Sequence, residues 1–261
     1  MVGKMNKPIV VKIGGSTFGS PDFIGVIEDL VTLQKEGKSL VVVHGGANVV
    51  TEWLSRLGIA TKIVDGLRAT TDLQTLQVVV AVLCGAVNKK IVADIQSRGG
   101  RAMGLSGIDG RLIEAKVKNE QLGYMGEVVK INPEPVETLL KEGYIPVVAP
   151  SGFGVEEAMP LNVNADPAAG ALAAALGAER LVLLTDVVGV MDGAGEPLPR
   201  LSPDEARSLI ASGVVAGGMI PKVEACLTAL ATVPITQIVD GRTPHALVEA
   251  IAGKGSGTII A

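Results

Sequence analysis

Short apolar segments alternate with longer amphipathic segments along most of the chain. The short segments are rich in Val, Ile and Leu, which is typical of buried strands. Strands are expected at residues 9–13, 39–43, 101–105, 112–118, 124–131, 145–149, 181–184, 235–239 and 257–260. Apolar residues three or four positions apart predict helices at 23–35, 49–57, 72–96, 133–141, 166–176, 203–210 and 222–231. This alternation predicts an α/β fold, a three-layer αβα sandwich with a mostly parallel central sheet.

Three segments make this prediction more specific. Residues 112–118 and 124–131 alternate around a glycine, which indicates a β-hairpin at the edge of the main sheet. Residues 257–260 are expected to form the last edge strand. The helix at 72–96 is apolar on more than one face, so it is buried either against a second subunit or entirely within one subunit. The pattern leaves both possibilities open.

Composition narrows the class of protein. The chain has 261 residues, of which 48% are apolar and only 2% aromatic, so the core must consist of Val, Leu, Ile and Ala. This length allows one large domain or two modest ones. The net charge of −4 and the lack of a basic stripe argue against a nucleic-acid partner. No apolar run is long enough to span a membrane, and residues 1–7 lack the pattern of an export signal.

The two cysteines, Cys84 and Cys226, stand in apolar helical contexts, where two buried thiols in a reducing cytoplasm are expected. The only histidines, His44 and His245, have no Cys or His nearby that would complete a metal site. We therefore expect a cytoplasmic protein without a protein-bound metal. Whether either cysteine has a role is left open by the sequence.

Two lysines beside glycines are the strongest candidates for chemistry. Lys12 interrupts an apolar strand and is followed closely by Gly14 and Gly15, and Lys222 follows a Gly-Gly pair at the start of a helix. A lysine in a buried strand is costly unless it meets an anion or a carboxylate. Backbone N–H groups at Gly14 and Gly15 could face the same anion. Two lysines on one polyphosphate would neutralise charge during phosphoryl transfer, so the pattern predicts a small-molecule kinase.

Other polar positions support this hypothesis when they are taken together. Asp166 alone would be read as a helix cap, but two lysines need a negatively charged organiser. The turn His44-Gly45-Gly46 could admit a phosphate or carboxylate, with His44 as a structural hydrogen-bonding group. Arg68 suits bidentate capture of a carboxylate. Thr185-Asp186 ends a strand where a nucleotide could bind, because ligands of parallel sheets lie at the carboxyl ends of the strands.

The pattern also excludes several enzyme classes. The P-loop signature and the protein-kinase motifs are missing from the sequence. A dinucleotide-dependent dehydrogenase would need Gly-x-Gly-x-x-Gly after the first strand, which Gly14-Gly15-Ser16 does not supply. No residue stands out as a dedicated general base. A carboxylate acceptor is already ionised at pH 7 and needs none, so the sequence is compatible with acyl-phosphate formation.

Six motifs, taken in order, resemble those of the amino acid kinase family, and the resemblance runs from about residue 9 to the C-terminus. The motifs are Lys12-Ile13-Gly14-Gly15, His44-Gly45-Gly46, Gly66-Leu67-Arg68, Asn162-Val163-Asn164-Ala165-Asp166, Leu184-Thr185-Asp186-Val187 and Gly218-Met219-Ile220-Pro221-Lys222. The resemblance implies phosphorylation of the γ-carboxylate of N-acetyl-L-glutamate by ATP with Mg²⁺, in arginine biosynthesis. It also implies an N-terminal lobe (1–178) for the acyl-amino acid and dimerisation and a C-terminal lobe (179–261) for ATP.

The resemblance further implies roles for individual residues. Lys12 would contact the transferred phosphoryl group, Lys222 the leaving side of ATP, and Asp166 both lysines. Arg68 would bind the α-carboxylate of the substrate and Asn162 the acetylglutamate. The other expected contacts are with phosphates at Gly14 and Gly15, with substrate at Gly46 and Ala47, and with the nucleotide at Asp186, Val187, Val188, Gly189, Val190, Met191, Val214, Val215 and Ala216.

Two features bear on substrate and assembly. The family usually carries a third glycine where this chain has Ala47, which could tighten the pocket and change the choice of acyl-amino acid. Arginine-inhibited members carry an N-terminal helix that links dimers into hexamers, and Lys12 lies close to the start of this sequence. We therefore expect a homodimer, paired through helix 72–96, that is insensitive to arginine.

Two alternatives remain within the same fold. One is a sister kinase for carrier-protein-bound aminoadipate or glutamate in lysine biosynthesis, which should carry a basic patch for an acidic carrier. No strong patch of this kind is evident in the sequence. The other is a catalytically silent nucleotide-binding protein, which would require loss of Lys12, Asp166 or Lys222. All three residues are present.

Overall fold

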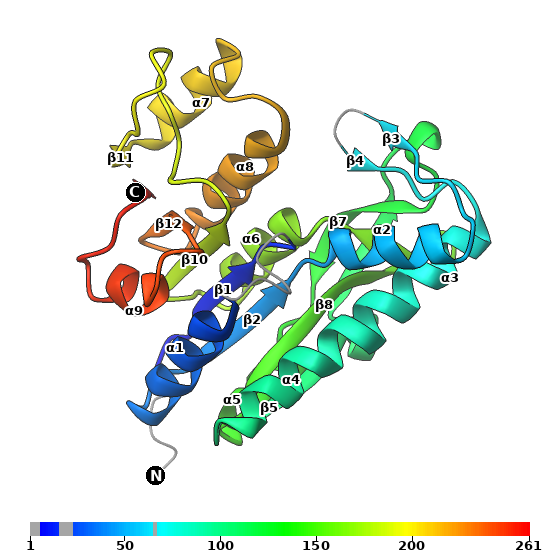
Figure 1. The fold of residues 1–261 in the computed structure, drawn as a ribbon, viewed down its shortest axis with the longest axis horizontal. Helices are drawn as coiled ribbons and strands as arrows, with labels where there is room; N and C mark the ends of the chain where they lie inside the picture. Colours follow the sequence, from blue (N-terminus) through cyan, green and yellow to red (C-terminus); the bar gives the residue numbers. More distant parts are fainter. Residues whose placement is uncertain (1–5, 16–22, 65–66) are drawn as a thin grey trace.

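The computed structural model describes residues 6–15, 23–64 and 67–261, and Figure 1 shows how its elements are arranged. The strands are β1 (Ile9–Ile13), β2 (Leu40–His44), β3 (Ile63–Val64), β4 (Leu67–Arg68), β5 (Ala102–Gly107), β6 (Ile113–Val117), β7 (Met125–Ile131), β8 (Ile145–Gly154), β9 (Pro160–Val163), β10 (Arg180–Thr185), β11 (Arg200–Leu201), β12 (Thr236–Asp240) and β13 (Thr258–Ile260). The α-helices are α1 (Phe23–Lys35), α2 (Ala47–Arg56), α3 (Leu73–Val80), α4 (Asn88–Ser97), α5 (Glu134–Lys141), α6 (Ala165–Ala175), α7 (Pro203–Ala211), α8 (Ile220–Ala229) and α9 (Ala246–Ile251). A π-helical turn, η1 (Ala81–Val87), joins α3 to α4, and shorter 3₁₀ turns occur at η2 (Asp109–Arg111), η3 (Glu120–Leu122) and η4 (Gly217–Met219).

Within the described residues, the main sheet contains 11 strands. Ten follow the order β11-β13-β12-β10-β1-β2-β8-β6-β7-β9, and β5 pairs with β8 beside this path. The central strands β12, β10, β1, β2 and β8 are parallel to one another. These strands are buried on both faces, which explains why their sequences are almost continuously apolar.

Helices cover both faces of the sheet, so the predicted three-layer sandwich is confirmed (Figure 1). Helices α5, α6 and α8 pack against a core that includes Val10, whereas α1, α2, α4 and α9 pack against a core that includes Ile9 and Val11. Successive side chains of a strand face opposite sides of the sheet. Lys12 therefore lies on the face of Val10, which is the face that α6 and α8 cover.

The expected edge hairpin and the expected last strand are placed differently. Strands β6 and β7 pair antiparallel as predicted, but β9 pairs with β8 and with Met125 and Gly126 at the start of β7, so among the described strands β7 has a free edge only beyond Gly126. Strand β9 was not predicted, because its last two residues belong to the polar motif Asn162-Val163-Asn164-Ala165-Asp166. Strand β13 is flanked by β12 on one side and β11 on the other, so it is not an edge strand among the described residues.

The remaining differences concern short or irregular elements. The two-residue strands β3, β4 and β11 and the short helix α9 were not predicted, because so few residues show no periodicity. The long helix expected at 72–96 is present, but η1 interrupts its α-helical geometry.

Cys226 is buried as expected, Cys84 is only partly buried, and both are free thiols. In the described parts of the chain, no helix is long and apolar enough to cross a membrane.

Candidate functional site

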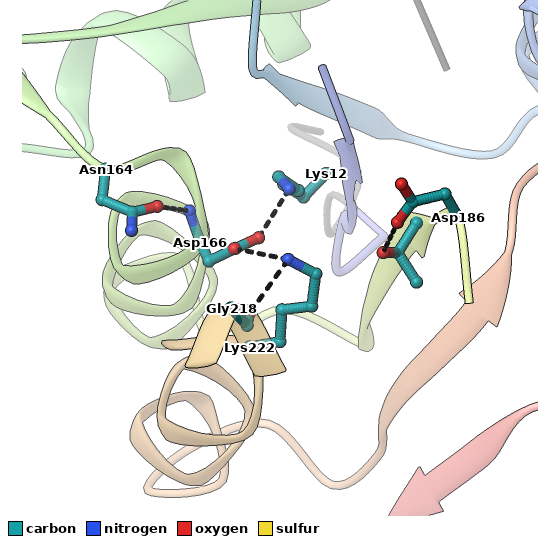
Figure 2. A network of polar contacts seen from close by, with 7 residues as sticks. Lys12, Asn164, Asp166, Asp186, Gly218 and Lys222 are labelled. Carbon is teal, nitrogen blue, oxygen red and sulfur yellow. Dashed lines mark hydrogen bonds and ion pairs between the residues drawn. The ribbon is translucent and has the colours of Figure 1, made fainter. Parts of the chain in front are cut away.

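Lys12 and Lys222 both reach the carboxylate of Asp166 (Figure 2). The Lys12 Nζ lies 2.6 Å from Asp166 Oδ1, and the Lys222 Nζ lies 3.1 Å from Asp166 Oδ2. The exposed fractions of the three side chains are 7% for Lys12, 6% for Asp166 and 17% for Lys222. Three residues from β1, α6 and α8 therefore form one largely buried charged cluster.

Local structure explains how these side chains meet. Lys12 faces α6 because of its register in β1. The Asn164 Oδ1 accepts a hydrogen bond from the Asp166 N–H at 3.0 Å, and this N-cap holds Asp166 in the first turn of α6. Helix α8 begins with Pro221 in its first turn, and the Lys222 Nζ also donates to the Gly218 carbonyl at 3.3 Å. The Gly-Gly-Met-Ile-Pro-Lys motif thus bends the chain so that its lysine returns toward the sheet.

The cluster carries an excess of positive charge. Burial lowers the pKa of Lys12, and the nearby charge of Lys222 lowers it further, whereas Asp166 raises it without restoring the ordinary value. Burial by itself raises the pKa of Asp166, but attraction to Lys12 and Lys222 outweighs this and leaves that pKa below its ordinary value. With all three groups ionised, two cations face one anion. A bound polyanion would therefore gain from this site more than a neutral molecule would.

Backbone N–H groups lie next to the cluster, at the ends of β1 and β2. A Cβ built on Gly15 would lie 2.9 Å from the Ala47 nitrogen and 3.0 Å from the Gly46 nitrogen. The lack of a side chain at Gly15 therefore keeps both nitrogens accessible. Among the described residues, the N–H groups of Gly15, Gly46 and Ala47 have no hydrogen-bond acceptor. Three neighbouring N–H groups without an acceptor are an arrangement that is suited to an anion.

Gly14 behaves differently from its neighbour. Its N–H donates to the Leu184 carbonyl at 3.0 Å, as part of the pairing between β1 and β10. The expectation that both Gly14 and Gly15 direct an N–H toward an anion is therefore wrong for Gly14 in this structure. Sheet pairing continues one residue beyond β1 and takes up that donor.

A cavity of about 300 Å³ opens beside the charged cluster. Its polar lining includes eight of the predicted site residues: Lys12, Gly15, Gly46, Ala47, Arg68, Asn162, Asp166 and Lys222. Its apolar lining includes Val50, Val79, Leu83, Met125 and Pro150. Residues that are distant in the sequence are thus brought to one cavity at the carboxyl ends of the parallel strands, where α/β sheets bind ligands.

Arg68 and Asn162 line this cavity, and each is hydrogen-bonded to a threonine. The Arg68 Nη2 donates to the Thr51 hydroxyl, while the Arg68 Nε is buried without an acceptor among the described residues. Burial lowers the pKa of Arg68. The Asn162 Nδ2 donates to the Thr70 Oγ1 at 3.0 Å. A guanidinium with a spare buried donor suits a carboxylate ligand, because a charge-assisted hydrogen bond would satisfy it.

The expected nucleotide residues do not line this cavity. Figure 2 shows Asp186 apart from Asp166, with Lys12 between them, and the charge of Asp186 raises the pKa of that lysine. Val190 and Val215 belong to the core, and the Val190 N–H donates to Thr258 Oγ1 at 2.8 Å. Gly189 is close to Thr258 as well. Val188 and Val214 are 44% and 40% exposed, so they contribute accessible apolar surface to these two loops.

Three contributors to the site were not recognised in the sequence. Thr70 and Thr51 are ordinary loop and helix residues whose role depends on tertiary contacts with Asn162 and Arg68. Leu83 lines the cavity from η1, and nothing in a helical pattern reveals a π-helical turn. The Gly66 part of the Gly66-Leu67-Arg68 motif lies outside the described residues. Thr51, Thr70 and Leu83 carry no local sequence signal that could have identified them as part of the site.

Comparison with known proteins agrees with this site. The sequence profile of the amino acid kinase family matches residues 7–238. The acetylglutamate kinase of Cereibacter sphaeroides is 46% identical over 97% of this chain and 87% of its own length, and that of Dehalococcoides mccartyi (strain BAV1) is 41% identical over 100% and 96%. The crystal structure of smu.665 from Streptococcus mutans has a TM-score of 0.80 and 30% identity, covering 97% of this chain and 98% of its own. This chain belongs to the amino acid kinase family.

Proposed function

We propose that this chain transfers the γ-phosphoryl group of ATP to the γ-carboxylate of N-acetyl-L-glutamate, giving N-acetyl-L-glutamyl 5-phosphate and ADP in arginine biosynthesis. The observation that carries the proposal is the bridge from Asp166 to both Lys12 and Lys222 at the wall of a cavity that also contains Arg68. The relatives at 46% and 41% identity named acetylglutamate kinase support this choice of substrate.

N-acetyl-L-glutamate would lie between the Arg68 guanidinium and the N–H groups of Gly46 and Ala47. Arg68, with its spare Nε donor, would take the α-carboxylate. Asn162 would contact the N-acetylglutamate backbone, and the N–H groups of Gly46 and Ala47 would face its γ-carboxylate. The apolar residues Val79 and Leu83 offer surface for the acyl part. Binding both ends of the substrate would set the distance between the γ-carboxylate and the lysines.

In the transfer step a γ-carboxylate oxygen attacks the γ-phosphorus of ATP. The bond from that phosphorus to the β,γ-bridging oxygen breaks, and ADP takes the electron pair. Lys12 would stabilise the transferred phosphoryl group, and Lys222 the charge that develops on the leaving oxygen. Asp166 would keep both ammonium groups on the line of transfer. No proton has to move, so positioning and charge neutralisation supply the catalysis.

The nucleotide would bind on the C-terminal side of the cluster. In this proposal the N-terminal lobe (1–178) binds the acid and the C-terminal lobe (179–261) binds ATP through the loops at Asp186–Met191 and Val214–Ala216. Gly15 would add an N–H donor to the phosphates. Mg²⁺ would enter as part of the ATP complex, held by its phosphates. Among the described residues there is no group of three or more His, Cys, Asp or Glu that could hold a metal ion.

The assembly we propose is a homodimer in the cytoplasm, paired along the helical segment from α3 to α4. Leu73 is 51% exposed, and the small residues Ala81, Ala86 and Ala93 are exposed on the same segment. Small side chains let two helices approach closely, so this face suits a second copy of the chain. Sedimentation equilibrium of the wild-type chain and of Ala86→Glu tests the proposal, and a monomeric wild type would contradict it.

An assay of ADP release against a panel of acids tests the proposed reaction. Turnover is expected with N-acetyl-L-glutamate and ATP, and much less with N-acetyl-aminoadipate, free glutamate or free aminoadipate. Turnover only with carrier-protein-bound aminoadipate or glutamate would favour the lysine-biosynthesis sister kinase. Binding of ATP without ADP release for any acid would favour a silent nucleotide-binding protein. The product should react with hydroxylamine, as acyl phosphates do, and a stable phosphate product would contradict carboxylate transfer.

A further inference from the structure

A buried polar pair lies beneath the glycine turn and has no part in the transfer step. His44 is the last residue of β2 and Asn88 the first residue of α4, with exposed fractions of 1% and 0%. The Asn88 Nδ2 lies 3.2 Å from the His44 Nε2. The other ring nitrogen, Nδ1, lies 2.7 Å from the Gly45 carbonyl oxygen. The two residues thus connect η1 and α4 to the turn that carries the N–H groups of the cavity.

The contacts around Asn88 determine which ring nitrogen of His44 carries the proton. The Asn88 Nδ2 also faces the carbonyls of Val147 at 2.8 Å and Leu105 at 3.3 Å, which can only accept. The Asn88 Oδ1 accepts from the Lys89 Nζ at 3.1 Å. The amide nitrogen is therefore the group that faces His44, and because an amide nitrogen cannot accept a hydrogen bond, the His44 Nε2 carries no hydrogen toward it. The Nδ1 then carries the hydrogen and donates it to Gly45.

This hydrogen bond bears directly on the binding turn. In a trans peptide the C=O of one residue and the N–H of the next lie in one plane and point in opposite directions. A hydrogen bond that fixes the Gly45 carbonyl toward His44 therefore directs the Gly46 N–H away from it. Gly46 lines the cavity. The tautomer of a buried histidine thus controls the direction of a ligand-binding donor.

Packing restricts this geometry further. A Cβ built on Gly46 would lie 2.7 Å from the Leu83 Cδ2 and 3.2 Å from the Val87 Cγ2, so η1 packs directly on the turn. A Cβ built on Gly104 would lie 1.9 Å from the Asn88 Oδ1. The lack of a side chain at Gly104 therefore leaves the space that the Asn88 amide oxygen occupies, and the contacts of the amide nitrogen with the Val147 and Leu105 carbonyls hold the amide in this orientation. The π-helical turn holds Leu83 over Gly46 and Asn88 under His44 at the same time.

We propose that Asn88 and His44 are positioning residues: Asn88 holds His44 as the Nδ1–H tautomer, and the Nδ1–H bond to the Gly45 carbonyl aims the Gly46 N–H at the acid in the cavity. The inference rests on the proposed function only for the identity of that acid. The proposal predicts that binding of the acid depends on an N–H donor at the place of the His44 Nδ1. It does not require the imidazole ring itself.

The tautomer can be observed directly. The chain has only two histidines, and His245→Asn leaves His44 as the single imidazole. Asn suits position 245, because His245 has φ 58° and Asn tolerates the left-handed region. Long-range ¹⁵N–¹H NMR of this variant is expected to show the Nδ1–H form. Asn88→Asp, which replaces the donor by an acceptor, is expected to shift His44 to the Nε2–H or doubly protonated form. An Nε2–H ring in the His245→Asn protein would overturn the proposal.

Kinetics with a matched pair of substitutions test the consequence for binding. In His44→Asn the amide nitrogen occupies the place of Nδ1, whereas in His44→Gln it occupies the place of Nε2. His44→Gln is expected to raise KM for the acid about tenfold, the scale of one lost hydrogen bond, with a smaller change in KM for ATP. His44→Asn should recover most of that loss. Equal effects of the two folded variants on both KM values would indicate a merely structural role and contradict the proposal.

The tests separate this inference from the proposed reaction. If the wild type fails to phosphorylate N-acetyl-L-glutamate, the proposed function falls, while the NMR result still decides the tautomer. The paired KM measurements then use whichever acid the ADP-release panel identifies. If Asn88→Asp does not fold, the His245→Asn spectrum and the His44 pair remain sufficient.

Discussion

The ammonium group of Lys12 lies 2.6 Å from the carboxylate of Asp166, and less than a tenth of either side chain is exposed. A buried ion pair of this kind depends on both partners, because removal of one leaves an uncompensated charge in a poorly solvated place. Here Asp166 has a second cationic partner in Lys222. The carboxylate of Asp166 therefore keeps the two ammonium groups together in the absence of a ligand.

Asp166→Asn should destabilise the fold as well as abolish activity. The variant leaves two facing cations without their bridge, and we expect the free energy of unfolding to fall by about 3–5 kcal/mol. Asp204→Asn is the control, because its pair with Arg207 is at the surface and its side chain is 95% exposed. Urea unfolding of both variants gives the comparison. If Asp166→Asn is as stable as the control, the charge balance described here is incorrect.

Lys222→Ala should reduce turnover while preserving the fold. Lys222 is the most exposed member of the cluster, so its loss is easier to accommodate than that of Asp166. We expect kcat to fall by ~10²–10³, the scale for removal of one transition-state donor. Lys141→Ala, at the exposed end of α5, serves as the control. Circular dichroism should be unchanged in both, and near-wild-type kcat in Lys222→Ala would refute its role in transfer.

Gly15→Ala tests the cluster of backbone donors. The added methyl group would lie about 3 Å from the nitrogens of Gly46 and Ala47 and cover both N–H groups. We expect kcat/KM to fall ~10²-fold or more, as for a lost oxyanion donor. Gly25→Ala is a matched control, since nothing lies within 4 Å of its added Cβ in helix α1. Full activity in Gly15→Ala would mean that these donors do not contact the reacting groups.

The layers of the fold and the charged cluster were accessible from the sequence because they rest on strong local signals. Lys12 stands out in an apolar strand, and Lys222 and Asp166 each lie in compact motifs at the start of helices. In a parallel sheet such motifs gather at one edge. Their convergence could therefore be inferred without knowing a single contact between them.

Other parts of the site depend on contacts that a sequence does not encode locally. Asn88 lies in a helical segment, and only the turn of η1 places it against His44. Gly14 and Gly15 are equivalent in the sequence, but sheet pairing uses the N–H of one and leaves the other accessible. Strand β9 reads as a polar motif because Asn162 points into the cavity. These differences arise from tertiary geometry rather than from residue preference.

Arg68→Ala should affect the acid more than the nucleotide. The Arg68 guanidinium lines the cavity and has a buried Nε without an acceptor among the described residues. Loss of charge-assisted hydrogen bonds to a carboxylate should raise KM for N-acetyl-L-glutamate by about 10- to 100-fold. Initial-rate kinetics should show KM for ATP nearly unchanged. Arg56→Ala is the control, because Arg56 pairs with Glu52 at the surface. A larger rise in KM for ATP than for the acid would exclude Arg68 as the carboxylate ligand.

The stability of the protein should depend on pH through His44. Burial lowers the pKa of His44 from 6.5 to about 4, and the charge of Lys89 adds to this effect. Between these two values the unfolded chain binds the proton and the folded chain does not, so stability is lost as the pH falls. The loss should be about 1.4 kcal/mol per pH unit and about 3 kcal/mol in total between pH 6.5 and pH 4.

Other groups titrate in the same range, so a difference measurement is needed to isolate His44. Asp29 raises the pKa of the exposed His245 through a hydrogen bond, and this pair acts in the opposite direction, gaining stability as the pH falls. Subtracting the urea-unfolding profile of His44→Gln from that of the wild type removes these shared contributions. The difference should be flat above pH 7 and slope steadily between pH 6.5 and pH 4. A difference that is flat throughout would mean that His44 titrates normally and that burial does not hold it neutral.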